Sequence, residues 1–246
     1  IRAKYADARR TEIVPVSNEI ELADLIQEED MAVTLTHYGY IKRVTADTYR
    51  AQKRGGKGIT GMTTREEDYV ETVFTASTHD SILFFTNLGK VYVRKGYRIP
   101  EAGRSARGQN IVNIIPTDPG EKVSAMIAGR GVTEDNYLVF VTRNGTVKRT
   151  AQSAFKNIRS NGIRALSLDE GDELISVLQT TGEDKILLAT HDGMAICFAE
   201  TDARAMGRDA VGVRGIRLRE GDYVVGAGIA AEGAAILSIT ENGYGK

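Results

Sequence analysis

Residues 138–149 read LVFVTRNGTVKR: an apolar strand, a tight turn around Gly145, and a second strand that ends in basic residues. Glycine readily adopts the positive φ that short hairpin turns require, so this pattern predicts a β-hairpin. The pattern occurs five times, with turn glycines about fifty residues apart. The five copies are residues 33–43, 82–94, 138–149, 186–198 and 236–246.

Each of the first four hairpins is followed by the same further elements. A basic stretch with a glycine leads into a short apolar strand, and an acidic turn then leads into another strand. One repeat therefore encodes about four short strands. A period near fifty residues with four strands per unit predicts an all-β fold in which four-stranded blades stack radially, with an open solenoid as the alternative.

The repeats divide the chain into a lead-in region and a blade domain. Residues 1–30 are expected to be a linker plus a lead-in element, because residues 1–10 are charged and residues 19–30 fit a short amphipathic helix or a strand. Residues 31–246 are expected to form the blade domain. Its repeats are residues 31–79, 80–135, 136–184, 185–233 and a partial 234–246.

Composition narrows the class of protein. Twenty-six glycines against four prolines suit many tight turns, and no apolar run approaches the ~20 residues that span a bilayer. The single cysteine, Cys197, lies in an apolar run and is predicted to be a buried thiol, which fits a reducing cytoplasm. The chain starts without methionine and stops within a repeat, so we expect it to be a piece of a longer protein.

Positive charge is concentrated in the same part of each repeat, although the whole chain has a net charge of −1. Four windows, residues 42–57, 90–107, 143–164 and 204–219, each carry a net charge between +4 and +6. Radial stacking would join these windows into a basic belt. Such a belt attracts a polyanion over many phosphates and releases its condensed counterions.

The most distinctive local motif is QKRGGKG at residues 52–58. Glycines let backbone N–H groups approach phosphate oxygens, Arg54 can engage two oxygens at once, and Lys53 and Lys57 add point charges. The motif therefore predicts a phosphate clamp formed by Gln52, Lys53, Arg54, Gly55, Gly56, Lys57 and Gly58.

With this heptapeptide the sequence resembles the family of DNA gyrase A C-terminal domains, whose hallmark "gyrase box" it matches throughout. Further similar segments are residues 7–13, 106–108, 204–207, 212–218 and 241–246, so the resemblance covers essentially the entire chain. It implies a β-pinwheel of six four-stranded blades that wraps duplex DNA around its rim and presents a segment for strand passage during ATP-driven negative supercoiling. This chain has only four complete repeats, so an incomplete disc is expected.

The resemblance and the repeat phase together nominate rim cations beyond the box as DNA contacts. They are Lys42, Arg43, Arg94, Lys95, Arg104, Arg107, Lys148, Arg149, Lys156, Arg159, Arg204 and Arg208. The implied partners are double-stranded DNA and the rest of gyrase A and gyrase B, in an A2B2 parent on the chromosome in the cytoplasm. The piece itself is expected to be monomeric and to contact no membrane.

No catalytic or metal-binding pattern is found. The Walker spacing is not met around Lys57, and the histidines lack cysteine or carboxylate partners at zinc-site spacing. In His191-Asp192 we expect the two side chains to point to opposite faces of a strand. The chain is thus predicted to be no enzyme and to bind no cofactor; ATP and Mg²⁺ are implied only for the rest of the parent, an ATP-dependent type II topoisomerase.

Two alternatives remain open at this point. The homologous C-terminal domain of topoisomerase IV has a degenerate box, so the intact heptapeptide favours gyrase. A protein-interaction β-propeller adaptor would bind peptides through its faces and would depend weakly on salt.

Overall fold

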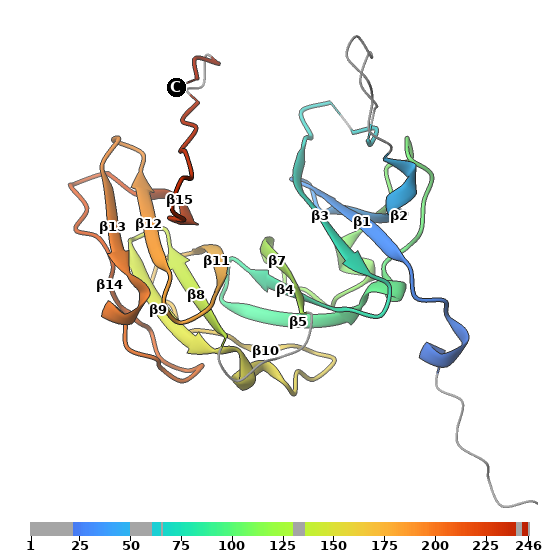
Figure 1. The fold of residues 1–246 in the computed structure, drawn as a ribbon, viewed down its shortest axis with the longest axis horizontal. Coiled ribbons are helices and arrows are strands. Elements are labelled where there is room, and N and C mark those ends of the chain that lie inside the picture. Colours follow the sequence, from blue (N-terminus) through green and yellow to red (C-terminus); the bar gives the residue numbers. More distant parts are fainter. Residues whose placement is uncertain (1–21, 50–60, 65, 130–135, 240–242, 246) are drawn as a thin grey trace, which may run out of the picture.

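The protein, described by a computed structural model over residues 22–49, 61–64, 66–129, 136–239 and 243–245, is an all-β arc of four propeller-like blades (Figure 1). The first blade orders its strands β3 (Val70–Ser77), β1 (Asp30–Thr36), β2 (Tyr40–Thr45) and β6 (Gln109–Asn110). The second orders β7 (Val123–Gly129), β4 (Ser81–Thr86), β5 (Lys90–Lys95) and β10 (Ile163–Arg164).

The third blade orders β11 (Leu174–Thr180), β8 (Tyr137–Thr142), β9 (Thr146–Ala151) and β14 (Val213–Arg214). The fourth has three strands, β15 (Val224–Ile229), β12 (Lys185–Thr190) and β13 (Ala195–Ala199). In Figure 1 the strands β3, β7, β11 and β15 lie on the concave side of the arc, whereas β10 and β14 lie on the convex side.

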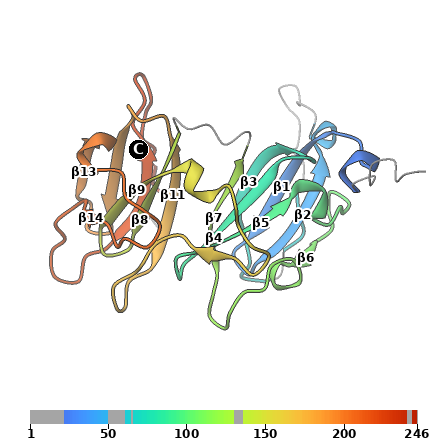
Figure 2. The ribbon, with the colours of Figure 1, turned by 90° about the horizontal axis from the view of Figure 1, so that it is seen from below.

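The blades exchange strands, which the repeat pattern does not reveal. The two-residue strand β6 follows β5 in the chain but pairs with β2 of the preceding blade. In the same way, β10 follows β9 but pairs with β5, and β14 follows β13 but pairs with β9. A blade is therefore not the same unit as a sequence repeat. Figure 2 shows the segments that carry these strands running between neighbouring blades.

The hairpins form as their glycines predict. Gly145, at φ 81°, donates its N–H to the carbonyl oxygen of Thr142 at 3.0 Å and closes the turn between β8 and β9. This φ is unfavourable for residues with a Cβ, which explains why glycine occupies the turn.

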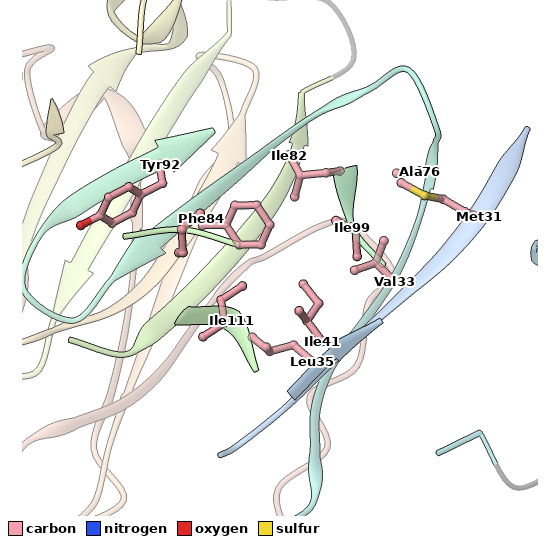
Figure 3. Packing of buried hydrophobic residues seen from close by; sticks show 11 residues of the cluster. Met31, Val33, Leu35, Ile41, Ala76, Ile82, Phe84, Tyr92, Ile99 and Ile111 are labelled. Carbon is pink, nitrogen blue, oxygen red and sulfur yellow. The ribbon is translucent and has the colours of Figure 1, made fainter. Parts of the chain in front are cut away.

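The cores lie between blades, because successive residues of a strand point to opposite faces. In β4, Ile82 and Phe84 pack into a cluster with the first blade, whereas Leu83 and Phe85 pack into one with the third. Figure 3 shows the first of these clusters, with Ile82 and Phe84 close to Ile41 and other apolar side chains of the first blade. Each central strand thus joins its blade to both neighbours.

The fourth blade ends the described array. No following blade covers β13 in the described ranges, and the thiol of Cys197 is exposed, so the prediction of a buried thiol is wrong. In the first three blades the outer strand comes from the next repeat, whereas β13 pairs only with β12 among the described residues. Beyond β15 the described residues form only one isolated bridge, between Ile239 and Gly245.

The lead-in region contains a 3-10 turn, η1 (Leu22–Leu25), and joins the first blade at Glu29, whose carbonyl oxygen accepts a hydrogen bond from the Thr78 N–H at 2.9 Å. Residues 1–21 lie outside the described ranges.

Gly108 immediately precedes the exchanged strand β6 and has φ 81°. A Cβ at this position would lie 2.3 Å from the carbonyl oxygen of Ile41. Gly108→Ala is therefore expected to lower the free energy of unfolding by about 1–3 kcal/mol, measured by urea denaturation. Gly103→Ala is the matched control, because a Cβ there would meet no atom within 4 Å; an equal loss in both variants would contradict the steric argument.

Candidate nucleic-acid interface

Three loops carry the exchanged strands across the convex side of the arc, and we call them the crossing loops. The first is residues 96–108, the second residues 152–162 and the third residues 200–212. Each begins with a 3-10 turn: η3 (Gly96–Arg98), η5 (Gln152–Phe155) or η6 (Glu200–Asp202). Each ends in a glycine followed by β6, β10 or β14, so equivalent loops recur at successive blades (Figure 2).

Most of the nominated cations lie on or next to these loops. The exposed ones are Lys95, Arg104, Lys156, Arg159 and Arg204. Arg107 and Arg208 are half-buried, and the Arg107 guanidinium lies 5.5 Å above the Tyr40 ring. The crossing loops therefore bring cations from separate repeats to one side of the molecule.

A groove of about 1030 Å³ lies between the second blade and the second crossing loop. Lys95, Lys156, Arg159 and Arg208 line it, and Asp80 is the one carboxylate among its lining residues. This charge balance favours an anionic ligand over a cationic one.

Lys42 and Lys148 do not reach the surface, and their predicted role as phosphate contacts is wrong. Both residues are 0% exposed. The Lys42 Nζ donates to the carbonyl oxygens of Gly61, at 2.8 Å, and of Gly103, Arg104 and Ala106. The Lys148 Nζ donates to those of Ala165, Arg208 and Ala210 at 2.8, 2.5 and 3.2 Å.

Burial lowers the pKa of both ammonium groups, and that of Lys148 falls to about 8. Lys148 therefore remains mainly protonated at neutral pH, where all three of its N–H groups can donate.

Three nominated arginines mainly make contacts within the protein. The Arg43 side chain is 15% exposed, donates from Nε to the Ile99 carbonyl oxygen at 2.9 Å and pairs with Glu101 at 3.0 Å. The Arg149 side chain is 11% exposed and lies 3.6 Å from the buried carboxylate of Glu200. Arg94 donates from Nε to the Ile114 carbonyl oxygen at 2.8 Å, and burial lowers its pKa.

The box at residues 52–58 lies outside the described residues. The chain on either side of it is described, and the Tyr49 hydroxyl donates to the Gly61 carbonyl oxygen at 3.4 Å. The two flanks of this segment are thus close to each other on the first blade.

Sequence reasoning missed three exposed arginines that belong to the same side. Arg98 lies on the first crossing loop, and Arg164 and Arg214 lie on the exchanged strands β10 and β14. The sequence could have identified Arg164 and Arg214, because each follows the last glycine of its crossing loop by two residues.

One cluster of possible metal ligands occurs among the described residues: His191, Asp192 and Asp222. His191 and Asp192 lie in a turn, with Nδ1 3.2 Å from Oδ1, so the expectation that their side chains point apart is wrong. Asp222 Oδ1 already accepts N–H bonds from Asp192 and Tyr223 at 3.0 and 2.9 Å. These contacts stabilise the turn without an ion.

Comparison with known proteins gives consistent matches. A family model described as "DNA gyrase C-terminal domain, beta-propeller" matches residues 30–77, 80–129, 136–181 and 184–231. The DNA gyrase A protein of Clostridium acetobutylicum is 52% identical over 215 residues, which cover 87% of this chain and 26% of that protein. The chain thus spans about a quarter of the length of this relative.

Two solved structures have the same fold with a TM-score of 0.71 each. The C-terminal domain of DNA topoisomerase IV is 31% identical, with 84% of this chain and 63% of that one covered. The DNA gyrase A C-terminal domain is 29% identical, with 88% and 70% covered. The helices in the described ranges are short 3-10 turns, and none could span a bilayer.

Proposed function

Because the chain belongs to the family of DNA gyrase A C-terminal domains, we propose that it binds duplex DNA and bends it along the convex side of the blade arc. The proposed contacts are the box and the cations at the crossing loops. They are residues 52–58 together with Lys95, Arg104, Arg107, Lys156, Arg159, Arg204 and Arg208.

The observation that carries the proposal is the recurrence of cations on equivalent loops of successive blades. Arg104, Lys156 and Arg204 are exposed on the first, second and third crossing loops. A duplex that follows these loops would meet cations at regular intervals, whereas the acidic turns precede the strands of the concave side. Phosphate contacts of this kind position DNA without reading its bases, so weak sequence preference is expected.

Several blades are needed to bend the duplex. Curving 20–30 base pairs costs about 1–6 kcal/mol by elastic estimates, and each charge-assisted hydrogen bond contributes only part of that. Cations at three loops and the box can together offset the cost, which one blade could not. The groove beside the second crossing loop, lined by Lys95 and Arg159, offers room for a phosphate backbone between two blades.

The proposal extends to the parent protein. There the domain would present the bent segment for strand passage during ATP-dependent negative supercoiling, with the rest of gyrase A and gyrase B as partners in an A2B2 assembly on the chromosome in the cytoplasm. We propose that this chain, itself monomeric, contributes DNA geometry and no bond chemistry, and that ATP and Mg²⁺ act elsewhere in the parent. The intact heptapeptide at residues 52–58 favours gyrase over topoisomerase IV.

The experiment that tests the proposal is fluorescence anisotropy over a salt series, with a duplex long enough to follow the arc and a short duplex as control. We expect log K against log [salt] to have a slope steeper than about −5 on the long duplex and much shallower on the short one, since each neutralised phosphate contributes about −0.9. Absence of binding at low salt would reject the DNA role and favour the adaptor.

A further inference from the structure

Lys42 and Lys148 occupy the same position in the first and third blades. Each follows its hairpin glycine, Gly39 or Gly145, by three residues and lies in the strand that receives an exchanged strand. Both side chains are wholly buried. A buried ammonium is costly unless hydrogen bonds satisfy it, so the partners of each one show what it stabilises.

Those partners are mainly backbone carbonyl oxygens of a crossing loop. Lys42 donates to Gly103, Arg104 and Ala106 of the first loop, and Lys148 donates to Arg208 and Ala210 of the third. One further carbonyl, of Gly61 or of Ala165, comes from the lysine's own repeat. Within the described ranges neither lysine forms a salt bridge.

The geometry couples each buried ammonium to an arginine at the surface. Lys42 binds the main-chain carbonyl of Arg104, and Lys148 binds that of Arg208 at 2.5 Å. Arg104 is exposed, Arg208 is half-buried and lines the groove, and both carry guanidinium groups proposed to contact phosphate. The main chain behind each guanidinium is therefore fixed by a lysine from a different repeat.

The second blade is an internal comparison, because Tyr92 takes the equivalent position. Its hydroxyl donates to Glu121 at 2.9 Å rather than to a crossing loop. Gly162 of the second loop packs closely on its ring, since a Cβ there would lie 2.7 Å from a ring carbon. Among the described residues, the second loop thus rests on an aromatic ring and has no buried ammonium bound to its carbonyl groups. A side chain of β5 does reach it, because Arg94 Nη2 donates to the Ser160 carbonyl oxygen at the longer distance of 3.4 Å.

We infer that Lys42 and Lys148 are positioning residues, whose buried ammonium groups clamp the first and third crossing loops so that the arginines of these loops are held toward DNA. This inference rests on the proposed function. The clamp itself is a property of the free protein, so it can be measured without DNA.

The test uses Lys42→Met and Lys148→Met, which keep an unbranched side chain and remove the ammonium. Native trypsin digestion followed by mass spectrometry measures cleavage after each loop cation. We expect Lys42→Met to speed cleavage after Arg104 and Arg107 at least tenfold, and Lys148→Met to do so after Arg204 and Arg208. Cleavage after Lys156 and Arg159 of the second loop should stay unchanged in both variants. Uniform acceleration at all three loops, or none, would overturn the clamp.

Wild-type protein provides a second measurement that does not depend on the variants folding. Cleavage should be slower after Arg104, whose carbonyl oxygen accepts from Lys42, than after Arg159, which is also exposed but has no such clamp on its loop. Equal rates at the two sites would contradict the inference.

DNA binding then tests the positioning role. The measurement is made at a temperature well below unfolding. The slope of log K against log [salt] should become shallower by about one to two in each variant, because two proposed phosphate contacts on its loop lose their fixed geometry. An unchanged slope with a loosened loop would reject the positioning role. If wild-type protein bound no DNA at all, the proposed function would fail, whereas the loop-specific trypsin pattern would still report on the clamp.

Discussion

Removing the charge of four exposed crossing-loop cations is expected to weaken binding of a long duplex by about 10²–10³-fold near 0.15 M salt and to reduce the salt slope by about 3 to 4. The variant replaces with glutamine Arg104, Lys156, Arg159 and Arg204. The reason is that each lost phosphate contact removes the counterion release that accompanied it. Anisotropy titration over a salt series measures both quantities.

The control is a pair of exposed cations away from the crossing loops. Lys122 adjoins the acidic turn before β7, and Arg143 lies at a hairpin tip, where its guanidinium stacks 3.9 Å above the Tyr223 ring. Lys122→Gln and Arg143→Gln should leave the slope nearly unchanged. An equal loss per charge in both sets would mean that total charge, and not a path along the convex side, determines binding.

Replacing Lys53, Arg54 and Lys57 with alanine is expected to reduce the curvature of bound DNA much more than its affinity. The cations of the crossing loops would still hold the duplex, while the box would no longer fix its course past the first blade. Energy transfer between dyes at the two ends of a duplex measures the bend, and the same sample gives the affinity. Bend and affinity falling together would argue against a dedicated wrapping role for the box.

The sequence predicted the hairpins and the four-stranded blades because both follow from local rules. Gly145 marks a tight turn, and a continuous apolar run such as Ile82 to Phe85 marks a strand that is covered on both faces. Strand exchange was not predictable, since β6, β10 and β14 have two residues each and carry no periodicity of their own. Their assignment to the preceding blade depends on contacts between residues about seventy positions apart in the sequence.

The same limit explains the residues that sequence reasoning misplaced. Lys42 and Lys148 lie in basic windows of the repeats, as Arg104 and Arg204 do. Counting charges cannot distinguish a buried ammonium from an exposed guanidinium. Their burial follows from carbonyl groups that the next repeat brings across. Cys197 has the apolar neighbours of a buried residue, but it lies on β13, which no outer strand covers among the described residues.

The most direct test of the DNA path is paired cross-linking from the crossing loops. In a Cys197→Ser background, photoreactive labels on Arg104→Cys with Arg159→Cys, or on Arg104→Cys with Arg204→Cys, would form two cross-links to one long duplex. We predict that the second pair reacts at DNA positions farther apart than the first, because the third loop lies farther along the arc than the second (Figure 2). Equal separations, or equally efficient cross-linking from Lys122→Cys, would contradict a duplex that follows the convex side from blade to blade.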